Sequence, residues 1–373
     1  MAETAERPLA ILHVLRAPVG GLFRHVVDLA RGQTARGHRV GILVDSTTGG
    51  EHAEAVISVL ARELALGVTR QLMSRHLGIS DISALRAVRR RVTEVGVDVV
   101  HGHGAKGGAY ARLTDGGALR AYTPHGGTLN FDPRSAAGIL YLGLERVLRG
   151  RTDLFLFESA HARDVFNARV GAPTALARVV HNGVTTPEFE PVAPGVDATD
   201  LVFVGELRQL KGVDLLIEAI ALLAADGRRV TATIVGEGPD SAAFRDLARQ
   251  RGIADALQFP GVLPAREAFA RGRLLVVPSR AESLPYIVLE AAAARVPLLA
   301  TGVGGIPEIY GPQSGALLPA GDATRLARAI GQAIADPATG RAGVTVLSER
   351  VRAGFNVDSM TDGVLAAYRA AIG

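Results

Sequence analysis

The sequence predicts an α/β protein built from two doubly wound parallel-sheet domains in tandem. The chain has 373 residues, enough for about two domains of roughly 150 residues, each with its own core. Short apolar runs alternate with longer segments of helical period, and unbroken apolar runs are typical of strands covered on both faces by helices. One interruption, at residues 186–197, holds three prolines and three acidic residues and indicates a linker.

The first domain, residues 1–185, is expected to hold six strands. Two segments with apolar residues at helical spacing, 22–36 and 82–95, are expected as helices between them. The strands are expected at residues 9–15, 40–44, 97–101, 120–123, 154–158 and 179–181.

The second domain, residues 198–357, repeats this scheme with five shorter runs. A last helix, residues 358–371, is expected to pack on one of the two domains, and packing back on the first is one option. Ligands of doubly wound sheets bind beyond the carboxyl ends of the strands, so a shared ligand is expected in a cleft that both domains face. The strands are expected at 201–205, 231–235, 257–259, 274–278 and 298–301, and helices at 213–224, 241–250, 285–294 and 323–335.

Composition excludes several classes of protein. With 48% hydrophobic and 21% charged residues the chain is not disordered. Cysteine is absent, which excludes disulfides, thiol nucleophiles and Cys-ligated metals. The longest apolar runs are shorter than the about 20 residues that span a bilayer. The N-terminal residues MAETAERPLA are acidic where an export signal is basic. We therefore expect a cytoplasmic protein.

Charge is distributed unevenly along the chain. Residues 1–185 carry 23 Lys+Arg against 16 Asp+Glu, which leaves 18 against 21 for the remainder. A basic first half favours a phosphorylated ligand or an anionic membrane surface, whereas 5% aromatic residues and no Trp disfavour nucleic acid. The basic side chains expected to meet anionic lipid are those of Arg86, Arg89, Arg90 and Arg91 and, within residues 140–151, Arg146, Arg149 and Arg151.

Glycines and histidines of the first domain follow strand ends. Gly20 and Gly21 let the backbone approach an anion that a helix N-terminus attracts, although a tight turn explains the pair equally well. His125 can hydrogen-bond a substrate hydroxyl or phosphate, or act structurally. His101 and His103 lack a third ligand at a recognisable spacing, so no metal site is expected there.

Two cations and two carboxylates follow strand ends in the second domain. Arg208 and Lys211 lie between a strand and a helix, where they can hold a pyrophosphate or belong to a solvated loop. Glu282 follows the fourth strand, beside loop amides and a helix start that suit a phosphate or sugar. Glu290 has only apolar neighbours in VLEAA. It must therefore bind hydroxyls or be paired, for example with Arg295.

Taken together and in this order, these motifs resemble those of the retaining glycosyltransferases of family 4, which have the two-domain GT-B fold, over nearly the full chain. The Glu282-to-Glu290 spacing is the most informative of them. The other matching segments are Gly20-Gly21 with His25, Thr123-Pro124-His125-Gly126, His181-Asn182-Gly183-Val184, Val204-Gly205-Glu206 with Arg208 and Lys211, Val235-Gly236-Glu237-Gly238-Pro239, and residues 301–308 (TGVGGIPE).

The resemblance implies roles for the matched side chains. Arg208 and Lys211 would hold the donor diphosphate and stabilise the leaving nucleoside diphosphate. Glu290 would bind the ribose hydroxyls, and Glu282 the hydroxyls of the donor sugar. His125 would lie beside the donor sugar and the reacting centre.

Backbone groups complete the implied donor site. The amides of Ser283 and Leu284 would assist at the donor sugar, those of Gly20 and Gly21 would approach the phosphate, and the backbone near Val262 would meet the base. The family needs no metal, so no metal or other cofactor is expected. Ser283 replaces a glycine that is frequent in the family, which puts the shape of this loop around the sugar in doubt.

The expected function is therefore transfer of a sugar, with retention, from a nucleotide-sugar, UDP-linked, to an acceptor hydroxyl. A lipid-linked or cell-surface polysaccharide intermediate is the expected acceptor, and peripheral membrane attachment is compatible with the basic first half. No enzyme nucleophile is evident, which favours a front-face mechanism over a covalent intermediate. Two alternatives remain: an epimerase or hydrolase of nucleotide-sugars with the same fold, and a non-catalytic protein that binds nucleotides or phosphosugars.

Overall fold

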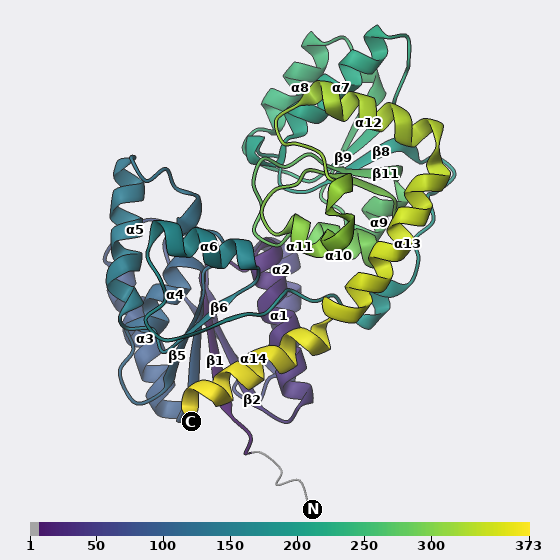
Figure 1. Cartoon of the computed structure of the whole chain (residues 1–373). Coiled ribbons are helices and arrows are strands. Elements are labelled where there is room, and N and C mark those ends of the chain that lie inside the picture. The colour runs from purple at the N-terminus through teal and green to yellow at the C-terminus, as the bar shows by residue number, and fades with distance from the viewer. Residues whose placement is uncertain (1–6) are drawn as a thin grey trace, which may run out of the picture. The chain divides into compact units, whose positions relative to one another are not determined.

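The computed structural model of the chain describes residues 7–373 (Figure 1). Residues 1–6 lie outside the described part of the chain. The prediction that the N-terminal residues are not an export signal falls mostly on them. The chain divides into two compact units. Unit 1 runs to Asn182 and also includes Val357–Gly373, and unit 2 is Gly183–Asn356. Each unit holds one parallel sheet, so the predicted fold class, two doubly wound α/β domains, is confirmed.

Unit 1 is built on a seven-stranded sheet of order β3-β2-β1-β4-β5-β6-β7. The order reverses between β1 and β4, which are neighbours although β2 and β3 separate them in sequence. The central strands are buried because helices cover both faces. The strands are β1 (Ala10–Leu15), β2 (Arg39–Asp45), β3 (Val68–Gln71), β4 (Val99–His103), β5 (Leu119–Thr123), β6 (Leu154–Phe157) and β7 (Leu176–Val179).

The last helix of the chain, α14 (Val357–Ile372), belongs to unit 1 and packs beside α1 (Gly20–Ala35) (Figure 1). Its buried residues Met360, Val364 and Tyr368 join Ile11 and Leu29 in one apolar cluster. Burial of this face holds α14 on the sheet although the chain reaches it only after passing through unit 2. The other helices of unit 1 are α2 (Gly50–Glu63), α3 (Ser80–Val95), α4 (Gly104–Arg112), α5 (Ala136–Arg149) and α6 (Ala160–Arg169).

Unit 2 is built on a five-stranded sheet of order β10-β9-β8-β11-β12. Its order reverses between β8 and β11, so the loops that follow these two strands begin next to each other at the carboxyl edge of the sheet and lead to helices on opposite faces. The strands are β8 (Thr199–Val204), β9 (Ala232–Val235), β10 (Leu257–Gly261), β11 (Gly272–Val277) and β12 (Leu298–Ala300). The helices are α7 (Val213–Ala225), α8 (Ser241–Gln250), α9 (Ala265–Ala270), α10 (Tyr286–Ala293), α11 (Ile306–Tyr310), α12 (Ala323–Ala335) and α13 (Pro337–Gly354).

Three strands of unit 1 differ from expectation by more than one residue, and helices α2, α4, α5 and α6 were not among the expected elements. Strand β3 has no predicted counterpart because its four residues, VTRQ, are mixed in polarity and only half-buried at the sheet edge. Strand β7 lies three residues before its expected start, since it too is a half-buried edge strand. Strand β4 begins at Val99 rather than at residue 97, because Gly96 in the left-handed conformation ends α3 and Val97 closes that helix.

The expected linker, residues 186–197, instead packs as part of unit 2. It opens with a short 3-10 helix capped by Thr185 and Glu188. Phe189 is buried beneath the guanidinium of Arg352, and the Val192 amide donates to the carbonyl of Ala294. The prolines therefore shape a packed extended segment, and the chain passes between the units at residues 182–183 and 356–357.

Candidate active site

The residues expected to hold the donor phosphates lie at the carboxyl edge of the unit 2 sheet, where its strand order reverses. The loop after β8 carries Arg208 and a short 3-10 helix, Gln209–Lys211, and then turns into α7 through Gly212. Gly212 has a positive φ of 75°, and a Cβ there would overlap the carbonyl oxygen of Pro278. The loops after β8 and β11 are therefore in direct contact at this edge.

Lys211 and Glu282 join these two loops. The Lys211 Nζ lies 2.7 and 2.8 Å from the two carboxylate oxygens of Glu282, and the Ser279 hydroxyl donates to Oε1 at 2.7 Å. The Glu282 side chain is 8% exposed and that of Lys211 27%. A carboxylate this buried needs such partners. The cation expected on the phosphates thus neutralises the carboxylate expected on the sugar.

Arg208 is more open. Its guanidinium lies 3.0 Å from Glu206, and both side chains are nearly half exposed, so solvent screens this pair and it contributes little to stability. Arg208 thus stays available to an anionic ligand.

A second arginine, Arg280 in the loop after β11, was not singled out by the sequence analysis and supports the site from behind its loops. The Arg280 guanidinium donates to Asp214 at 2.6 and 2.8 Å and to the Gln209 carbonyl oxygen at 2.6 Å. Its amide donates to the Leu210 carbonyl at 2.8 Å. Its position two residues before Glu282 is the sequence feature that could have identified Arg280 as part of the site. Arg280 therefore holds the two loops in register.

The backbone after Glu282 is shaped by the loop that follows β12. The Gly305 amide donates to the Ser283 carbonyl at 2.6 Å, and a Cβ on Gly304 would overlap the carbonyl oxygen of Glu282. Leu284 is buried in the core of unit 2, which anchors the start of α10. Because glycine alone permits this approach, residue 304 defines the position of the Glu282 backbone.

The remaining expected donor residues lie at the same edge or on α10. Glu290 is half-buried between Leu289 and Ala291, both of which are fully buried. Val262 follows β10 at the far end of the edge and is 68% exposed. Glu290 therefore lies on α10 and Val262 beside the outermost strand of the sheet, and the roles that the resemblance implies for them stay predictions.

In unit 1, Gly20 and Gly21 form the exposed start of α1. Gly20 has a φ of 65°, and the residue before it provides no side-chain cap. The first amides of α1 therefore have no intrahelical acceptor, and they lie where the partial positive charge of the helix is greatest.

His125 follows β5 with a positive φ of 53°, which is rare for a residue with a side chain. Its Nε2 lies 3.0 Å from Nδ1 of His103, and its Nδ1 lies 3.9 Å from Glu158. Burial lowers the pKa of His125 to about 3. The ring is therefore neutral at physiological pH and can exchange hydrogen bonds but carries no charge.

His125 belongs to a cluster of five histidines that the sequence analysis did not assemble. His13 on β1 is level with His101 on β4, and His103 lies two residues further on the same face. His25 comes from α1 and lies edge-on to His125 with ring centroids 4.8 Å apart. Burial lowers the pKa of His13 to about 4 and that of His25 to about 3. The placement of His101 and His103 two residues apart on one strand, and so on one face of the sheet, is the sequence feature that could have indicated this cluster.

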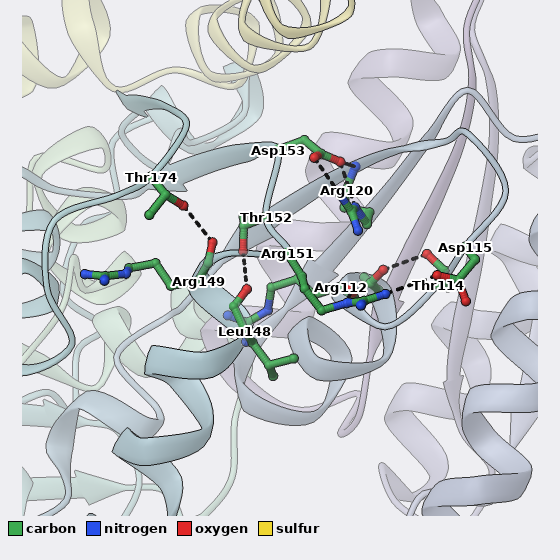
Figure 2. Close-up of polar contacts among 11 residues, drawn as sticks. Arg112, Thr114, Asp115, Arg120, Leu148, Arg149, Arg151, Thr152, Asp153 and Thr174 are labelled. Carbon is green, nitrogen blue, oxygen red and sulfur yellow. Dashed lines mark hydrogen bonds and ion pairs between the residues drawn. The ribbon is translucent and has the colours of Figure 1, made fainter.

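The arginines expected to face a membrane make polar contacts inside unit 1. Arg151 donates to the Arg112 carbonyl oxygen at 3.2 Å and to Asp115 at 3.1 Å, as Figure 2 shows. Arg90 lies 3.7 Å from Glu94, and Arg86 is exposed. Arg151 is therefore held within unit 1, whereas solvent screens the exposed Arg90–Glu94 pair. Four more of these arginines donate to backbone carbonyl oxygens as Arg151 does: Arg89, Arg91, Arg146 and Arg149.

Beside these arginines, α3, α4 and α5 line an apolar pocket of 380 Å³. Ile82, Leu144 and Val147 contribute to it and are 53%, 39% and 71% exposed. These side chains leave apolar surface of α3 and α5 accessible to solvent. Within residues 7–373, no helix combines the length and apolarity that crossing a bilayer requires.

Comparison with known proteins agrees with this architecture. Residues 19–188 match the sequence profile described as Glycosyltransferase Family 4, and residues 198–336 match that of Glycosyl transferases group 1. Among curated proteins, the D-inositol 3-phosphate glycosyltransferase of Frankia alni is 30% identical, with 95% of each chain covered. Glycogen synthase of Mycobacterium tuberculosis is 27% identical, covering 95% of this chain and 92% of that protein.

Solved structures show the same fold. Sucrose-phosphate synthase from Thermosynechococcus elongatus superposes with a TM-score of 0.81 at 21% identity, covering 96% of this chain and 98% of that one. HepE of Anabaena in complex with UDP-glucose gives 0.79 at 17%, covering 97% and 100%. Profiles that match both units and a relative that is 30% identical over nearly its whole length establish the family. The chain is a glycosyltransferase and belongs to glycosyltransferase family 4.

Proposed function

We propose that this glycosyltransferase takes a sugar from a UDP-linked nucleotide-sugar and transfers it, with retention, to an acceptor hydroxyl. The observation that carries the proposal is the contact of Lys211 with Glu282 at the point where the unit 2 sheet reverses its strand order. A cation for phosphate and a carboxylate for hydroxyls are thereby held side by side. The structure of HepE with UDP-glucose, a protein of the same fold, supports UDP as the nucleotide.

In this proposal the donor diphosphate replaces Glu282 as the partner of Lys211. Arg208 binds the phosphates bidentately and Lys211 acts as a point charge, which suits their side-chain geometries. Breaking the sugar–phosphate bond builds negative charge on the leaving diphosphate. Fixed cations stabilise that charge more in the transition state than in the ground state, which lowers the barrier.

The released Glu282 and the amides of Ser283 and Leu284 then hold the hydroxyls of the donor sugar, while Glu290 on α10 binds those of the ribose. The backbone at Val262 meets the base. Each of these groups lies at the carboxyl edge of the unit 2 sheet or on α10, where doubly wound sheets bind ligands.

Unit 1 supplies the groups around the reacting centre. The neutral ring of His125 hydrogen-bonds a hydroxyl there, and the first amides of α1, at Gly20 and Gly21, approach a phosphate. We infer a front-face transfer without an enzyme nucleophile and without a metal on the diphosphate, since two cationic side chains are at hand to neutralise it.

We further propose a lipid-linked polysaccharide intermediate as acceptor, reached at an anionic membrane surface. The apolar pocket beside α5, with Val147 71% exposed, supports this, together with the exposed cation of Arg86. Flotation with vesicles of phosphatidylglycerol or phosphatidylcholine tests it. We expect binding to the anionic vesicles at low salt, a reduction in V147E, and no change in I334E, a matched substitution in unit 2. Absence of vesicle binding by the unmodified protein would refute this part.

Calorimetric titration with UDP tests the donor site. Loss of a charge-assisted hydrogen bond typically costs about 1.5–3 kcal/mol, or about 10–150-fold in affinity. We expect R208A and K211A to lose UDP affinity in that range. R229A removes an exposed arginine of unit 2 that pairs with the exposed Asp255, and it should bind UDP normally. If all three variants bind UDP alike, the donor assignment is wrong.

Incubation with UDP-sugars separates transfer from the alternatives. A transferase releases UDP slowly without acceptor and rapidly with one, whereas a hydrolase releases it at the same rate in both cases and an epimerase changes the sugar without releasing UDP. Tight donor binding without turnover, unaffected by E282Q, would favour a binding protein.

A further inference from the structure

Three rings of the five-histidine cluster in unit 1, those of His25, His103 and His125, are suited to bind a metal ion. The hydrogen bonds around them leave one nitrogen of each ring directed toward the other two. One ring nitrogen from each of His25, His103 and His125 lies within 4.8 Å of the other two. His25 and His103 are buried, and the side chain of His125 is 8% exposed. The nitrogens of a second possible set, His13, His101 and His103, also lie within 4.8 Å of one another, so the protonation of each ring decides between the two sets.

The second set is closed by hydrogen bonds. His101 Nδ1 lies 2.7 Å from the Tyr368 hydroxyl, and His101 Nε2 lies 2.9 Å from the Thr123 hydroxyl. His13 Nε2 lies 2.8 Å from Gln33 Oε1, and its Nδ1 lies 3.0 Å from His103 Nε2. Both nitrogens of both rings already have partners. This set therefore forms a hydrogen-bonded support.

The hydrogen bonds of His13 determine which nitrogen of His103 carries the proton. Gln33 Oε1 can only accept, so the proton of His13 is on Nε2 and its Nδ1 carries a lone pair. His103 Nε2–H therefore donates to His13 Nδ1, and the lone pair of His103 is on Nδ1. This is the atom that lies 3.0 Å from His125 Nε2.

The same reasoning applies to the other two rings. His25 Nδ1 donates to Asn182 Oδ1 at 2.9 Å, so its lone pair is on Nε2. Among the described residues, this buried Nε2 has no hydrogen-bond partner. His125 presents Nε2 to His103, while its Nδ1 faces the buried carboxylate of Glu158 at 3.9 Å. Each ring thus has an acceptor behind it, which is how metal-ligating histidines are oriented in proteins.

Ring spacing agrees with metal ligation. Three imidazoles bound at 2.0–2.1 Å in a tetrahedral arrangement place their centroids about 5.2 Å apart. The centroids of His25, His103 and His125 are 4.8, 5.3 and 5.6 Å apart in pairs. Small rotations that turn the three nitrogens inward would therefore complete the site.

We propose that His25 Nε2, His103 Nδ1 and His125 Nε2 bind one divalent transition-metal ion of the zinc class. An all-nitrogen set of neutral rings suits Zn²⁺ or Co²⁺ and offers nothing to Mg²⁺ or Ca²⁺, which prefer oxygen. On binding, the proton of His125 moves from Nε2 to Nδ1, where the N–H faces the carboxylate of Glu158 at 3.9 Å, so no proton is released. Three protein ligands leave the fourth position to water or to a ligand hydroxyl.

This inference departs from the expectation drawn from His101 and His103, for which the sequence shows no third ligand. The ligand set uses only the second of those residues and adds rings from α1 and from the loop after β5. The site does not use the proposed donor cations, which are in unit 2, but it shares His125 with the proposed function. Once the ion is bound, neither ring nitrogen of His125 is open to a hydroxyl, and the hydroxyl proposed to contact this ring would meet the fourth position of the ion instead.

Titration of the full-length protein with Co²⁺, after removal of metal with EDTA, tests the proposal. We expect one Co²⁺ per chain with the intense visible absorption of tetrahedral cobalt, displaced by Zn²⁺, and a higher melting temperature with Zn²⁺. His25→Phe keeps the ring volume but removes the ligand atom, and His125→Asn suits the left-handed backbone at this position. Both should weaken binding by about 100-fold or more, because losing even a group that orients a ligand costs about 10–100-fold.

His76→Asn, on an exposed histidine of unit 1, is the matched control and should bind Co²⁺ like the unmodified protein. Circular dichroism identifies any variant that fails to fold, in which case the other ligand variant decides. The proposal is overturned if the unmodified protein takes up no stoichiometric cobalt. It is also overturned if a folded ligand variant binds cobalt as tightly as the control does.

Discussion

Replacing Glu282 by glutamine should strengthen the binding of UDP while slowing transfer. In the structure both carboxylate oxygens of Glu282 hold Lys211, at 2.7 and 2.8 Å. A diphosphate must therefore displace Glu282 from Lys211 before it gains that cation. Glutamine keeps the hydrogen-bonding shape and the contact with Ser279 but removes the competing charge.

The magnitude follows from the exposure of the pair. A hydrogen bond to a charged group contributes about 1.5–3 kcal/mol. Because the Lys211 side chain is 27% exposed, solvent screening favours the lower value, about 1.5 kcal/mol, or roughly tenfold in affinity. Loss of the carboxylate from the sugar hydroxyls should lower kcat by about 100-fold, as removal of one transition-state contact does in other enzymes.

Calorimetric titration with UDP at fixed ionic strength measures the first effect, and steady-state transfer measures the second. The double variant E282Q/K211A should bind UDP like K211A alone, because the competition acts only through Lys211. The reasoning is refuted if E282Q binds UDP more weakly than the unmodified protein. It is equally refuted if the gain persists when Lys211 is absent.

Three further predictions concern stability and the shape of the site. E145A should destabilise unit 1 by about 3–5 kcal/mol in urea unfolding, because it leaves the fully buried guanidinium of Arg112, 2.8 Å from Glu145, without a counter-charge; a loss below about 1 kcal/mol would contradict this. The free energy of unfolding should be greatest above pH 6.5. Below that pH it should fall by about 1.4 kcal/mol for each unit by which the pH is lowered, for each histidine whose pKa is lowered on folding, because the unfolded state then binds more protons than the folded state. Urea unfolding between pH 7 and 4.5 measures it, and a flat profile would exclude neutral buried rings at His13, His25 and His125. G304A should reduce transfer strongly, because its Cβ would overlap the Glu282 carbonyl oxygen, whereas G302A, with 3.4 Å to its nearest neighbour, should not; equal activities would show that the loop adjusts freely.

Much of unit 2 was predictable because its signals are local. Strands β8 and β11 and helices α7 and α10 are rich in apolar residues, and helices α8 and α12 begin and end at the predicted residues. In a parallel sheet the residues after the strands must meet at one edge. The sequence therefore placed Arg208, Lys211 and Glu282 at a common edge of the sheet before any contact between them was known.

Other elements depend on packing between distant segments. Strands β3 and β7 are half-buried and mixed in polarity, so apolar periodicity does not identify them. The proline-rich segment at 186–197 has the composition of a linker, yet burial of Phe189 attaches it to unit 2. Composition records which residues a segment contains, but whether another surface covers them is a property of the whole fold.

The sequence by itself determined the alternation of strands and helices, the two-sheet architecture and the edge at which ligands bind, because these follow from local periodicity and from the geometry of parallel sheets. Only the tertiary structure decided which groups touch. Lys211 meets Glu282 across 71 residues, α14 returns to unit 1, and five histidines from two strands, a helix and a loop meet in one cluster. Such contacts depend on register and helix packing over long separations, which no local pattern encodes.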